Sequence, residues 1–229
     1  MLVWNPEGVD DAIWESLRKH FSEQEIIELG YFVALTYGQQ RWIKTLGIEH
    51  GEVLADATAG LGPGKPDTHA RPRKPDKLGF RKDDTQAGST RLGKTDNLGP
   101  GEDGSRLGAN PNEVRGRVPA VLSSYLETRE EVLLGGVVED ELKERCARFL
   151  VGEPIEPRDE RERAAFDWAY AIAWDSDRAA AELWERLHRQ FSEPELVELG
   201  YAIAFMLGQQ HWARTLGLPP EIAAIERAC

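Results

Sequence analysis

The chain of 229 residues carries 28 lysines and arginines against 40 aspartates and glutamates, which gives a formal net charge of −12. This acidic balance argues against a nucleic-acid partner, because nucleic-acid binding normally needs a concentrated basic face. The sequence has no apolar run of membrane-spanning length, and no leader with a charged start and an apolar centre. We therefore expect no membrane association and a cytoplasmic location.

The chain has only two cysteines, Cys146 and Cys229. Two cysteines do not make a disulfide framework or a metal site. The sequence therefore predicts neither a metal nor another cofactor. Cys146 has no second cysteine nearby in the sequence, so we expect it to be a small apolar side chain in the core.

Residues 1–60 form the first copy of an internal repeat. Five aromatic residues in this region recur 170 positions later. They are Trp4, Trp14, Phe21, Tyr31 and Trp42, which recur as Trp174, Trp184, Phe191, Tyr201 and Trp212. The spacing stays constant over a helix-loop-helix, so the sequence predicts one structural unit that is used twice. We call two residues that lie 170 positions apart counterparts.

Each copy contains one long apolar segment, at residues 21–47 and 191–217. Both segments begin with the S-x-x-E spacing of a capping box, in which the serine oxygen accepts a backbone N–H and the glutamate reaches back. Both end at a glycine, which is typical of a helix C-terminus. Because the segments are apolar on almost every face, we expect two long helices that are buried on all sides, inside a core or between subunits.

Small residues recur at every fourth position in both long segments. They are Gly30, Ala34 and Gly38 in the first copy, and Gly200, Ala204 and Gly208 in the second. An interior glycine costs a helix about 1 kcal/mol relative to alanine, so its repetition favours a compensating close approach of two helices. The alternative interpretation is that a stable helix simply tolerates these glycines.

The first copy is shorter than the second. The segment RERAAFDWAYAIAW, at residues 161–174, precedes the second copy, and its counterpart would lie before Met1. The long helix of the first copy must then be covered by the second copy or by another chain, because large exposed apolar surfaces seldom persist. We therefore expect a homo-oligomer that is held together by the long apolar helices.

Residues 61–109 differ in character from both copies. Glycine, proline, lysine, aspartate, arginine and threonine dominate, and the dipeptide Leu-Gly recurs. Such a segment buries too little apolar surface to offset its conformational entropy, so we expect a disordered, flexible linker. A nucleic-acid-binding arm and a joining sequence between a gene fragment and a full gene are the alternatives.

Residues 110–229 make a complete module in which apolar residues follow helical spacing. The segments with that spacing are VPAVLSSYLETREEVLLGG, EDELKERCARFL, RERAAFDWAYAIAW, AAAELWERLHRQ, the long apolar segment and EIAAIERA. No segment alternates with the period of a β-strand. The sequence therefore predicts an all-α fold.

Several of these segments resemble the carboxymuconolactone decarboxylase family, which includes the alkylhydroperoxidase-D-like (AhpD-like) proteins. The resemblance rests on residues 110–150, on RERAAFDWAYAIAW and on LWERLHRQFSEPELVELGYAIAFMLGQQHWARTLG. It covers about residues 110–218, with residues 4–61 as a partial second copy. The resemblance implies an AhpD-like helical bundle that assembles into trimers or hexamers, here with a partial helical repeat at its N-terminus.

The peroxidase branch of that family carries a glutamate on a helix, then a Cys-x-x-Cys pair and a histidine. Glu144 matches the glutamate, but the cysteine positions fall on Glu156 and Asp159, and the histidine position falls on Arg163. Without a thiolate and its resolving partner, the thiol peroxidase cycle has no nucleophile. The resemblance therefore implies a cysteine-less variant.

The decarboxylase branch implies groups that move protons on a small organic acid, usually a histidine with a carboxylate. The candidate catalytic residues are Glu144, Glu198 and His211. Structural roles compete with these assignments. The counterpart of His211 is Arg41, which favours a solvated or subunit-contact role for the histidine. Glu198 is expected to pair with an arginine of a neighbouring helix.

Two functional hypotheses follow. The first is an enzyme of this family that acts on a small-molecule ligand, either an organic acid or a hydroperoxide, in a pocket between helices. The second is a non-catalytic protein whose helices serve oligomerisation or interaction. A pocket lined by Glu144, Glu198 or His211 would discriminate between the two hypotheses, and a position of these side chains on unrelated outer surfaces would contradict the enzyme as stated.

Overall fold

A computed structural model of the chain describes residues 9–48 and 110–219. Every regular element in these two ranges is a helical segment and neither range contains a β-strand, which confirms the predicted all-α class. No helix in these ranges is long and apolar enough to cross a lipid bilayer. The predicted linker at residues 61–109 and the predicted helix EIAAIERA lie outside the described residues.

The helices are α1 (Asp11–Arg18), α2 (Glu23–Thr45), α4 (Pro111–Gly116), α5 (Pro119–Thr128), α6 (Asp140–Leu150), α7 (Glu160–Ala173), α8 (Ala181–Gln190) and α9 (Glu193–Thr215). Helix α2 and the helices from α5 to α9 keep the boundaries that the sequence pattern indicates to within a few residues, whereas α4 was not predicted. A π-helical turn, η2 (Arg129–Leu133), extends α5, and a short 3-10 turn, η3 (Ser176–Arg178), links α7 to α8.

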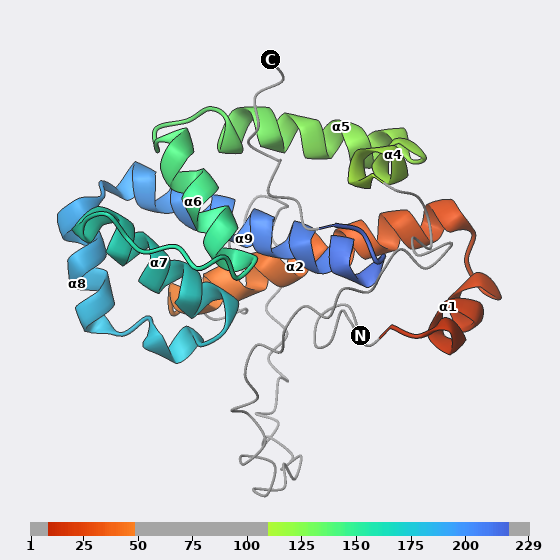
Figure 1. The fold of residues 1–229 in the computed structure, drawn as a ribbon, viewed down its shortest axis with the longest axis horizontal. Coiled ribbons are helices and arrows are strands. Elements are labelled where there is room, and N and C mark those ends of the chain that lie inside the picture. The colour runs from red at the N-terminus through yellow and green to blue at the C-terminus, as the bar shows by residue number, and fades with distance from the viewer. Residues whose placement is uncertain (1–8, 49–109, 220–229) are drawn as a thin grey trace, which may run out of the picture. The chain divides into compact units, whose positions relative to one another are not determined.

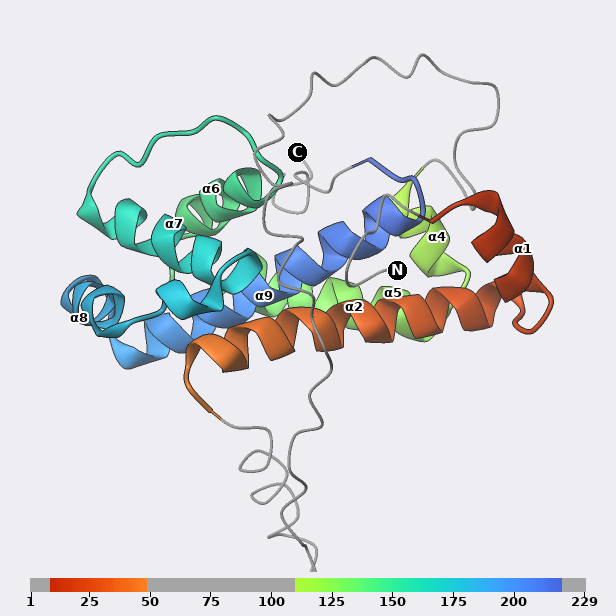
Figure 2. The ribbon, with the colours of Figure 1, turned by 90° about the horizontal axis from the view of Figure 1, so that it is seen from below.

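Helices α2 and α9 pack side by side and antiparallel (Figures 1 and 2). Gly38 of α2 lies against Ala204 of α9, and Gly208 of α9 lies against Ala34 of α2. At both places a β-carbon on the glycine would overlap the carbonyl oxygen of the alanine, so the two backbones touch. The predicted close approach is confirmed, and the alternative that these glycines are merely tolerated is wrong.

The contacts between α2 and α9 occur in related pairs. The ring of Tyr31 meets Trp212 edge-on with 6.4 Å between the ring centroids, and its counterpart Tyr201 meets Trp42 in the same way at 6.2 Å. The glycine–alanine contacts are exchanged in the same manner. If each residue in these Tyr–Trp and Gly–Ala pairs is replaced by its counterpart, the other pair of the same kind is obtained. Contacts around a twofold axis are related in this way.

Both long helices begin with the predicted capping box. The backbone N–H of Ser22 donates to Glu25 Oε2 over 2.7 Å, and that of Ser192 donates to Glu195 Oε2 over 2.7 Å. Each helix is followed by a glycine with a positive φ angle, as predicted. The ends of α2 and α9 are thus fixed by residues close in sequence.

The two long helices differ in burial. Phe191 and Leu199 of the second copy are 4% and 0% exposed, whereas their counterparts Phe21 and Leu29 are 40% and 46% exposed. Helix α9 is buried along most of its length, as predicted. Within the single chain the N-terminal half of α2 keeps one apolar side exposed, so the burial of α2 between subunits stays a prediction.

The difference in burial follows from the position of α6 and α7. Helix α7 packs against both α9 and α2, and α6 packs against α9 and α7. Arg41 Nε of α2 donates to the backbone oxygen of Ile172 near the end of α7 over 2.7 Å. Within the described residues no helix covers the N-terminal half of α2 in the way that α7 covers that of α9 (Figure 2).

Replacing Gly38 or Gly208 by alanine is expected to lower the free energy of unfolding by about 1–3 kcal/mol or more, because the added methyl group meets a backbone carbonyl. Gly116, the last residue of α4, is the control. A β-carbon there meets only Leu122 Cδ2 at 3.7 Å, so Gly116→Ala should be neutral or slightly stabilising. Urea denaturation measures the difference, and equal stabilities would contradict the backbone contact.

Candidate functional site

A buried lysine lies beside one of the predicted site residues. The Lys143 ammonium group of α6 donates to the backbone oxygens of Val132 and Gly135 over 2.8 and 2.5 Å, and to Glu198 Oε1 of α9 over 3.0 Å. An ammonium group has three N–H donors, so these three bonds use all of them. Lys143 therefore ties the end of η2 to α9 and has no donor left for a substrate.

Glu198 also holds the loop between η2 and α6. Its carboxylate accepts hydrogen bonds from the backbone N–H groups of Val137 and Val138, over 2.5 and 3.1 Å. Gly136 has a φ angle of 90°, and a β-carbon there would overlap the carboxylate. The expected arginine partner of Glu198 is corrected to Lys143, because α6 passes over α9 at this point and its compact ammonium group reaches three acceptors.

The other two predicted site residues lie elsewhere. His211 is half-buried on α9, and its ring packs on Tyr37 of α2 with 4.8 Å between the centroids. It lies thirteen residues from Glu198 on one helix, which places the two about 20 Å apart along the axis. One small substrate cannot contact both. Glu144 is half-buried on α6, and its catalytic role stays a prediction.

The thiol of Cys146 is fully buried on α6. Burial, and then the charge of Glu162, raise the pKa of Cys146 to about 12. A thiol with this pKa stays protonated at neutral pH and is a poor nucleophile. The predicted role of Cys146 as a small buried side chain is confirmed. Within residues 9–48 and 110–219, no cluster of three or more His, Cys, Asp or Glu side chains could hold a metal ion.

Glu156 and Asp159, the two positions onto which the expected resemblance places cysteines, have structural contacts in this chain. Asp159 is the N-cap of α7, and its carboxylate accepts from the backbone N–H of Glu162 over 2.8 Å. The backbone oxygen of Glu156 accepts a hydrogen bond from Arg145 Nη2 over 2.7 Å. Both positions therefore fix the connection between α6 and α7.

Glu162 is a nearly buried carboxylate between α6 and this connection. Arg158 Nε donates to it over 2.6 Å, and Arg145 Nε lies 2.9 Å from the same oxygen. Burial raises the pKa of Glu162, but the hydrogen bonds from Arg158 and the contact with Arg145 outweigh burial and leave the pKa lowered. Glu162 therefore stays ionised and acts as an electrostatic link between the two helices.

The sequence analysis missed a buried cation, Arg115 of α4. Its guanidinium carbon lies 3.6 Å from the ring centroid of Tyr125 and 4.6 Å from that of Trp212, and Nη2 donates to Gln209 Oε1 over 2.7 Å. The electron-rich faces of the two rings stabilise the cation in the core. Gln209, a polar residue in an apolar helix, is the sequence signal that could have indicated a buried polar partner.

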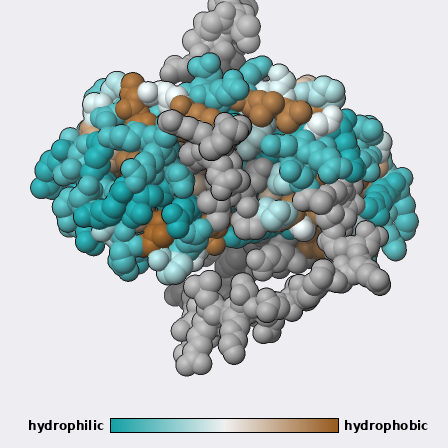
Figure 3. Space-filling view, turned by 45° about the horizontal axis from the view of Figure 1, so that its top comes forward, coloured by the Kyte–Doolittle hydropathy of each residue, from teal (hydrophilic) through white to brown (hydrophobic). Residues whose placement is uncertain are grey.

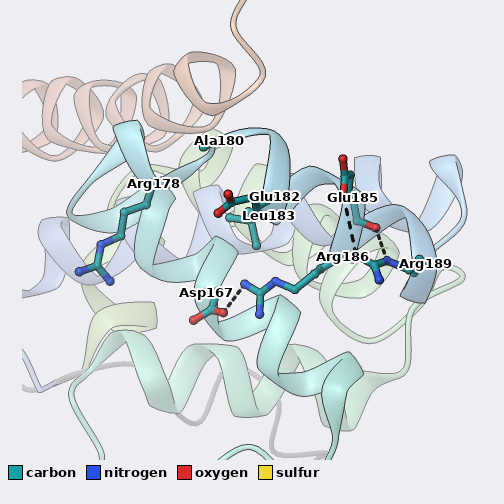
Figure 4. Close-up of a pocket in the computed structure, with 8 residues that line it drawn as sticks. All are labelled: Asp167, Arg178, Ala180, Glu182, Leu183, Glu185, Arg186 and Arg189. Atoms are coloured by element: carbon teal, nitrogen blue, oxygen red, sulfur yellow. Dashed lines mark hydrogen bonds and ion pairs between the residues drawn. The ribbon is translucent and has the colours of Figure 1, made fainter.

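A first cavity, of about 480 Å³, lies against α7, η3 and α8 (Figure 4). Its charged lining residues are Asp167, Arg178, Glu182, Glu185, Arg186 and Arg189. Arg186 Nη2 donates to Asp167 over 2.5 Å, and Arg189 Nε donates to the backbone oxygen of Glu185 over 3.1 Å. The charges balance one another at the surface, and such exposed ion pairs contribute little energy.

A second cavity, of about 290 Å³, lies between α1, α2 and the end of α9 and is mostly apolar. Its lining includes Trp14, Phe21, Leu29, Gly30, Trp212 and Thr215. A third, more open cavity of about 720 Å³ lies beside Glu198 and Tyr201. None of these three cavities is lined by more than one predicted site residue. The face shown in Figure 3 is mainly hydrophilic, with separate hydrophobic patches.

No protein-family model matches the chain. No match was found among curated proteins, and none was found among solved structures. The function is therefore inferred from the contacts of the chain itself.

Glu198→Gln is expected to lower the free energy of unfolding by about 3 kcal/mol, because it leaves the buried ammonium group of Lys143 without its counter-charge. The exposed counterpart on α2, Glu28, is the matched control. Glu28→Gln should change the stability by less than about 0.5 kcal/mol. Urea denaturation distinguishes the two. Equal stabilities would show that the Lys143–Glu198 pair is not structural and would return Glu198 to the catalytic candidates.

The two capping boxes differ in their charged partners. Hydrogen bonds from Ser192, and then one from Arg161 Nη2 over 2.7 Å, lower the pKa of Glu195 to about 2. Ser22 also lowers the pKa of Glu25. Because the folded-state pKa of Glu195 lies below its unfolded value, the ionised carboxylate stabilises the fold at neutral pH. That stabilisation is lost as the pH falls from about 4.5 to about 2.

The free energy of unfolding should therefore fall more steeply between about pH 4.5 and 2 in the wild type than in Glu195→Gln. Glu25→Gln is the control and should keep most of the wild-type fall, because Arg161 bonds to Glu195. Urea denaturation at a series of pH values measures the slopes. Parallel curves for all three chains would be the contradicting result.

Proposed function

We propose that this chain is a non-catalytic helical interaction protein, which binds a second copy of itself through the uncovered side of the first copy. The observation that carries the proposal is the unequal exposure of counterparts. Phe32 of α2 is 65% exposed, while its counterpart Ala202 is 0% exposed. Phe21 and Leu29 are exposed in the same way. We call Phe21, Leu29 and Phe32 the α2 patch.

Burial of the α2 patch against a partner would contribute substantial free energy to association. Burying one phenylalanine or leucine side chain contributes about 1.5–3 kcal/mol. Single exposed apolar residues are ordinary, but a group of three large ones at the start of one helix is typical of an interaction surface. A second copy brings the same patch, and a self-complementary surface of this kind suits a twofold dimer. The proposal therefore retains the predicted homo-oligomer.

The state of the candidate catalytic groups supports a non-catalytic role. All three donors of Lys143 are used within the protein. The carboxylate of Glu198 is taken up by Lys143 and by two backbone N–H groups. Cys146 is buried and protonated. Of the candidate catalytic residues, Glu198 is therefore engaged by contacts within the protein, while the roles of Glu144 and His211 stay predictions.

The resemblance to the carboxymuconolactone decarboxylase family is part of the proposal. We infer an AhpD-like helical bundle in which the redox residues have been replaced by residues that hold the fold. What supports this is the helical order of the segments that carry the resemblance, together with the helix-capping role of Asp159 at a cysteine position.

Phe32→Ser is expected to raise the dissociation constant of self-association about tenfold, which corresponds to about 1.4 kcal/mol of lost apolar burial. Val197→Ser is the matched control, because Val197 is 60% exposed on α9 and lies outside the α2 patch. It should leave the dissociation constant unchanged. Sedimentation velocity over a range of protein concentrations measures both.

A wild-type chain that stays monomeric at every concentration would refute self-association, and so would equal weakening by both substitutions. Peroxide consumption that depends on Cys146 would refute the non-catalytic role.

A further inference from the structure

Helix α7 fills a groove that is formed by α8, α9 and the C-terminal end of α2. Its Trp168 is fully buried, and the indole N–H donates to Thr45 Oγ1 over 3.2 Å. The indole ring meets Trp184 of α8 edge-on with 5.4 Å between centroids. Gly200 provides the space, because a β-carbon there would overlap the ring. We call this groove the filled slot.

A second contact fixes α7 two turns before Trp168. The guanidinium carbon of Arg161 lies 4.1 Å from the ring centroid of Phe191, and Nη2 donates to Glu195 Oε1 over 2.7 Å. Arg161 and Trp168 are seven residues apart, so they lie on one side of the helix with about 10 Å between them along its axis. The filled slot thus recognises one cation and one indole on the same helix face.

The first copy forms the same groove without the helix. This groove is the apolar cavity of about 290 Å³ between α1, α2 and the end of α9. Its lining includes Trp14, Gly30 and Thr215, the counterparts of Trp184, Gly200 and Thr45. The residues that surround an indole in the second copy therefore surround a cavity in the first. We call this cavity the open slot.

The hydroxyl groups of the two slots are arranged alike. Thr45 Oγ1 donates to the backbone oxygen of Trp42 over 2.7 Å, and Thr215 Oγ1 donates to that of His211 over 2.8 Å. Each hydroxyl thus donates its hydrogen to a backbone oxygen of its own helix, and its own oxygen is left as a hydrogen-bond acceptor. In the filled slot that oxygen accepts the indole N–H. The open slot offers the same acceptor.

The cation-binding part of the filled slot is also repeated. Phe21 and Glu25 are the counterparts of Phe191 and Glu195, and both are exposed. Phe21 lines the open slot, and Glu25 stands one turn away on α2. The aromatic ring and the carboxylate beside the open slot thus have the same sequence spacing as the pair that binds Arg161 in the second copy.

In the part of the chain that the structure describes there is one α7, and it already occupies the filled slot. In the whole sequence, Trp168 is the one tryptophan that has an arginine seven residues before it. A helix of a different protein that carries the same two side chains would fit the open slot without removing α7 from the filled slot.

We propose that the open slot binds a helix of a partner protein that carries an arginine and, seven residues later, a tryptophan on the same face. Small residues should flank the tryptophan, since Ala164, Ala165 and Ala169 are the buried neighbours of Trp168 on α7. The arginine packs on Phe21 and pairs with Glu25, and the indole N–H donates to Thr215. This inference goes beyond the proposed self-association, because it assigns a different occupant to the surface.

The probe is a fluorescein-labelled peptide with the sequence of residues 159–174, which contains Arg161 and Trp168. Fluorescence anisotropy measures its binding to the full chain in a Phe32→Ser background, at a chain concentration below the dissociation constant of the weakened self-association, because Phe21 and Leu29 belong both to the α2 patch and to the open slot. Saturable binding of one peptide per chain is expected. Trp168→Ala in the peptide should weaken binding at least about tenfold, and Arg161→Ala should weaken it several-fold.

Variants of the chain locate the binding. Gly30→Leu places a side chain in the open slot and should abolish peptide binding. Thr215→Val removes the acceptor and should weaken binding several-fold, and it keeps the test valid if Gly30→Leu does not fold. Glu28→Gln, an exposed change on α2 outside the slot, is the control and should bind the peptide as the parent chain does.

Binding that survives Gly30→Leu and Thr215→Val, or that does not depend on the tryptophan of the peptide, would overturn the inference. The inference would also be overturned if the peptide displaced the chain's own α7 from the filled slot. In that case Thr45→Val would weaken peptide binding and Gly30→Leu would not. Absence of peptide binding to a chain that self-associates overturns this inference alone. A monomeric wild-type chain that binds the peptide overturns the proposed self-association alone.

Discussion

The contact between the backbones of α2 and α9 is the constraint on which the rest of the structure depends. Gly38 and Gly208 have no side chains, so the helices approach until each glycine touches the carbonyl group of an alanine on the other helix. That distance brings two pairs of aromatic rings into edge-on contact on either side of the crossing. It also sets the width of the groove that holds Trp168. A wider separation would weaken all three contacts together.

Much of the fold could be predicted from the sequence, because helix caps and periodicity depend on residues that are close in the chain. Ser192 and Glu195 indicate the start of α9 without knowledge of any other element. The close approach of α2 and α9 was also predictable. Interior glycines destabilise a helix, and nothing within either helix requires them, so their recurrence in both copies indicates a contact with another helix. The unequal burial was not predictable from local sequence. Leu29 and Leu199 have similar sequence neighbours and differ only in the helices that reach them in space.

The candidate site was predicted less well, for a related reason. A charged residue in an apolar helix indicates a buried partner, and this was correct for Glu198. Which partner it is depends on the residue of α6 that crosses above it, and this cannot be read from α9 alone. Arg115 gave no signal of its own, because its rings and its acceptor come from α5 and α9. In this fold the enclosed charges hold connections and helix ends in place.

The antiparallel pairing of α2 with α9 has a consequence for the synthesis of the protein. The two helices are far apart in the chain, and contacts between distant segments form slowly because a long loop must close first. The ribosome releases α2 early and α9 only after most of the chain has been made. During that interval the nascent chain carries the apolar segment of α2 before α9, against which it packs, has been made.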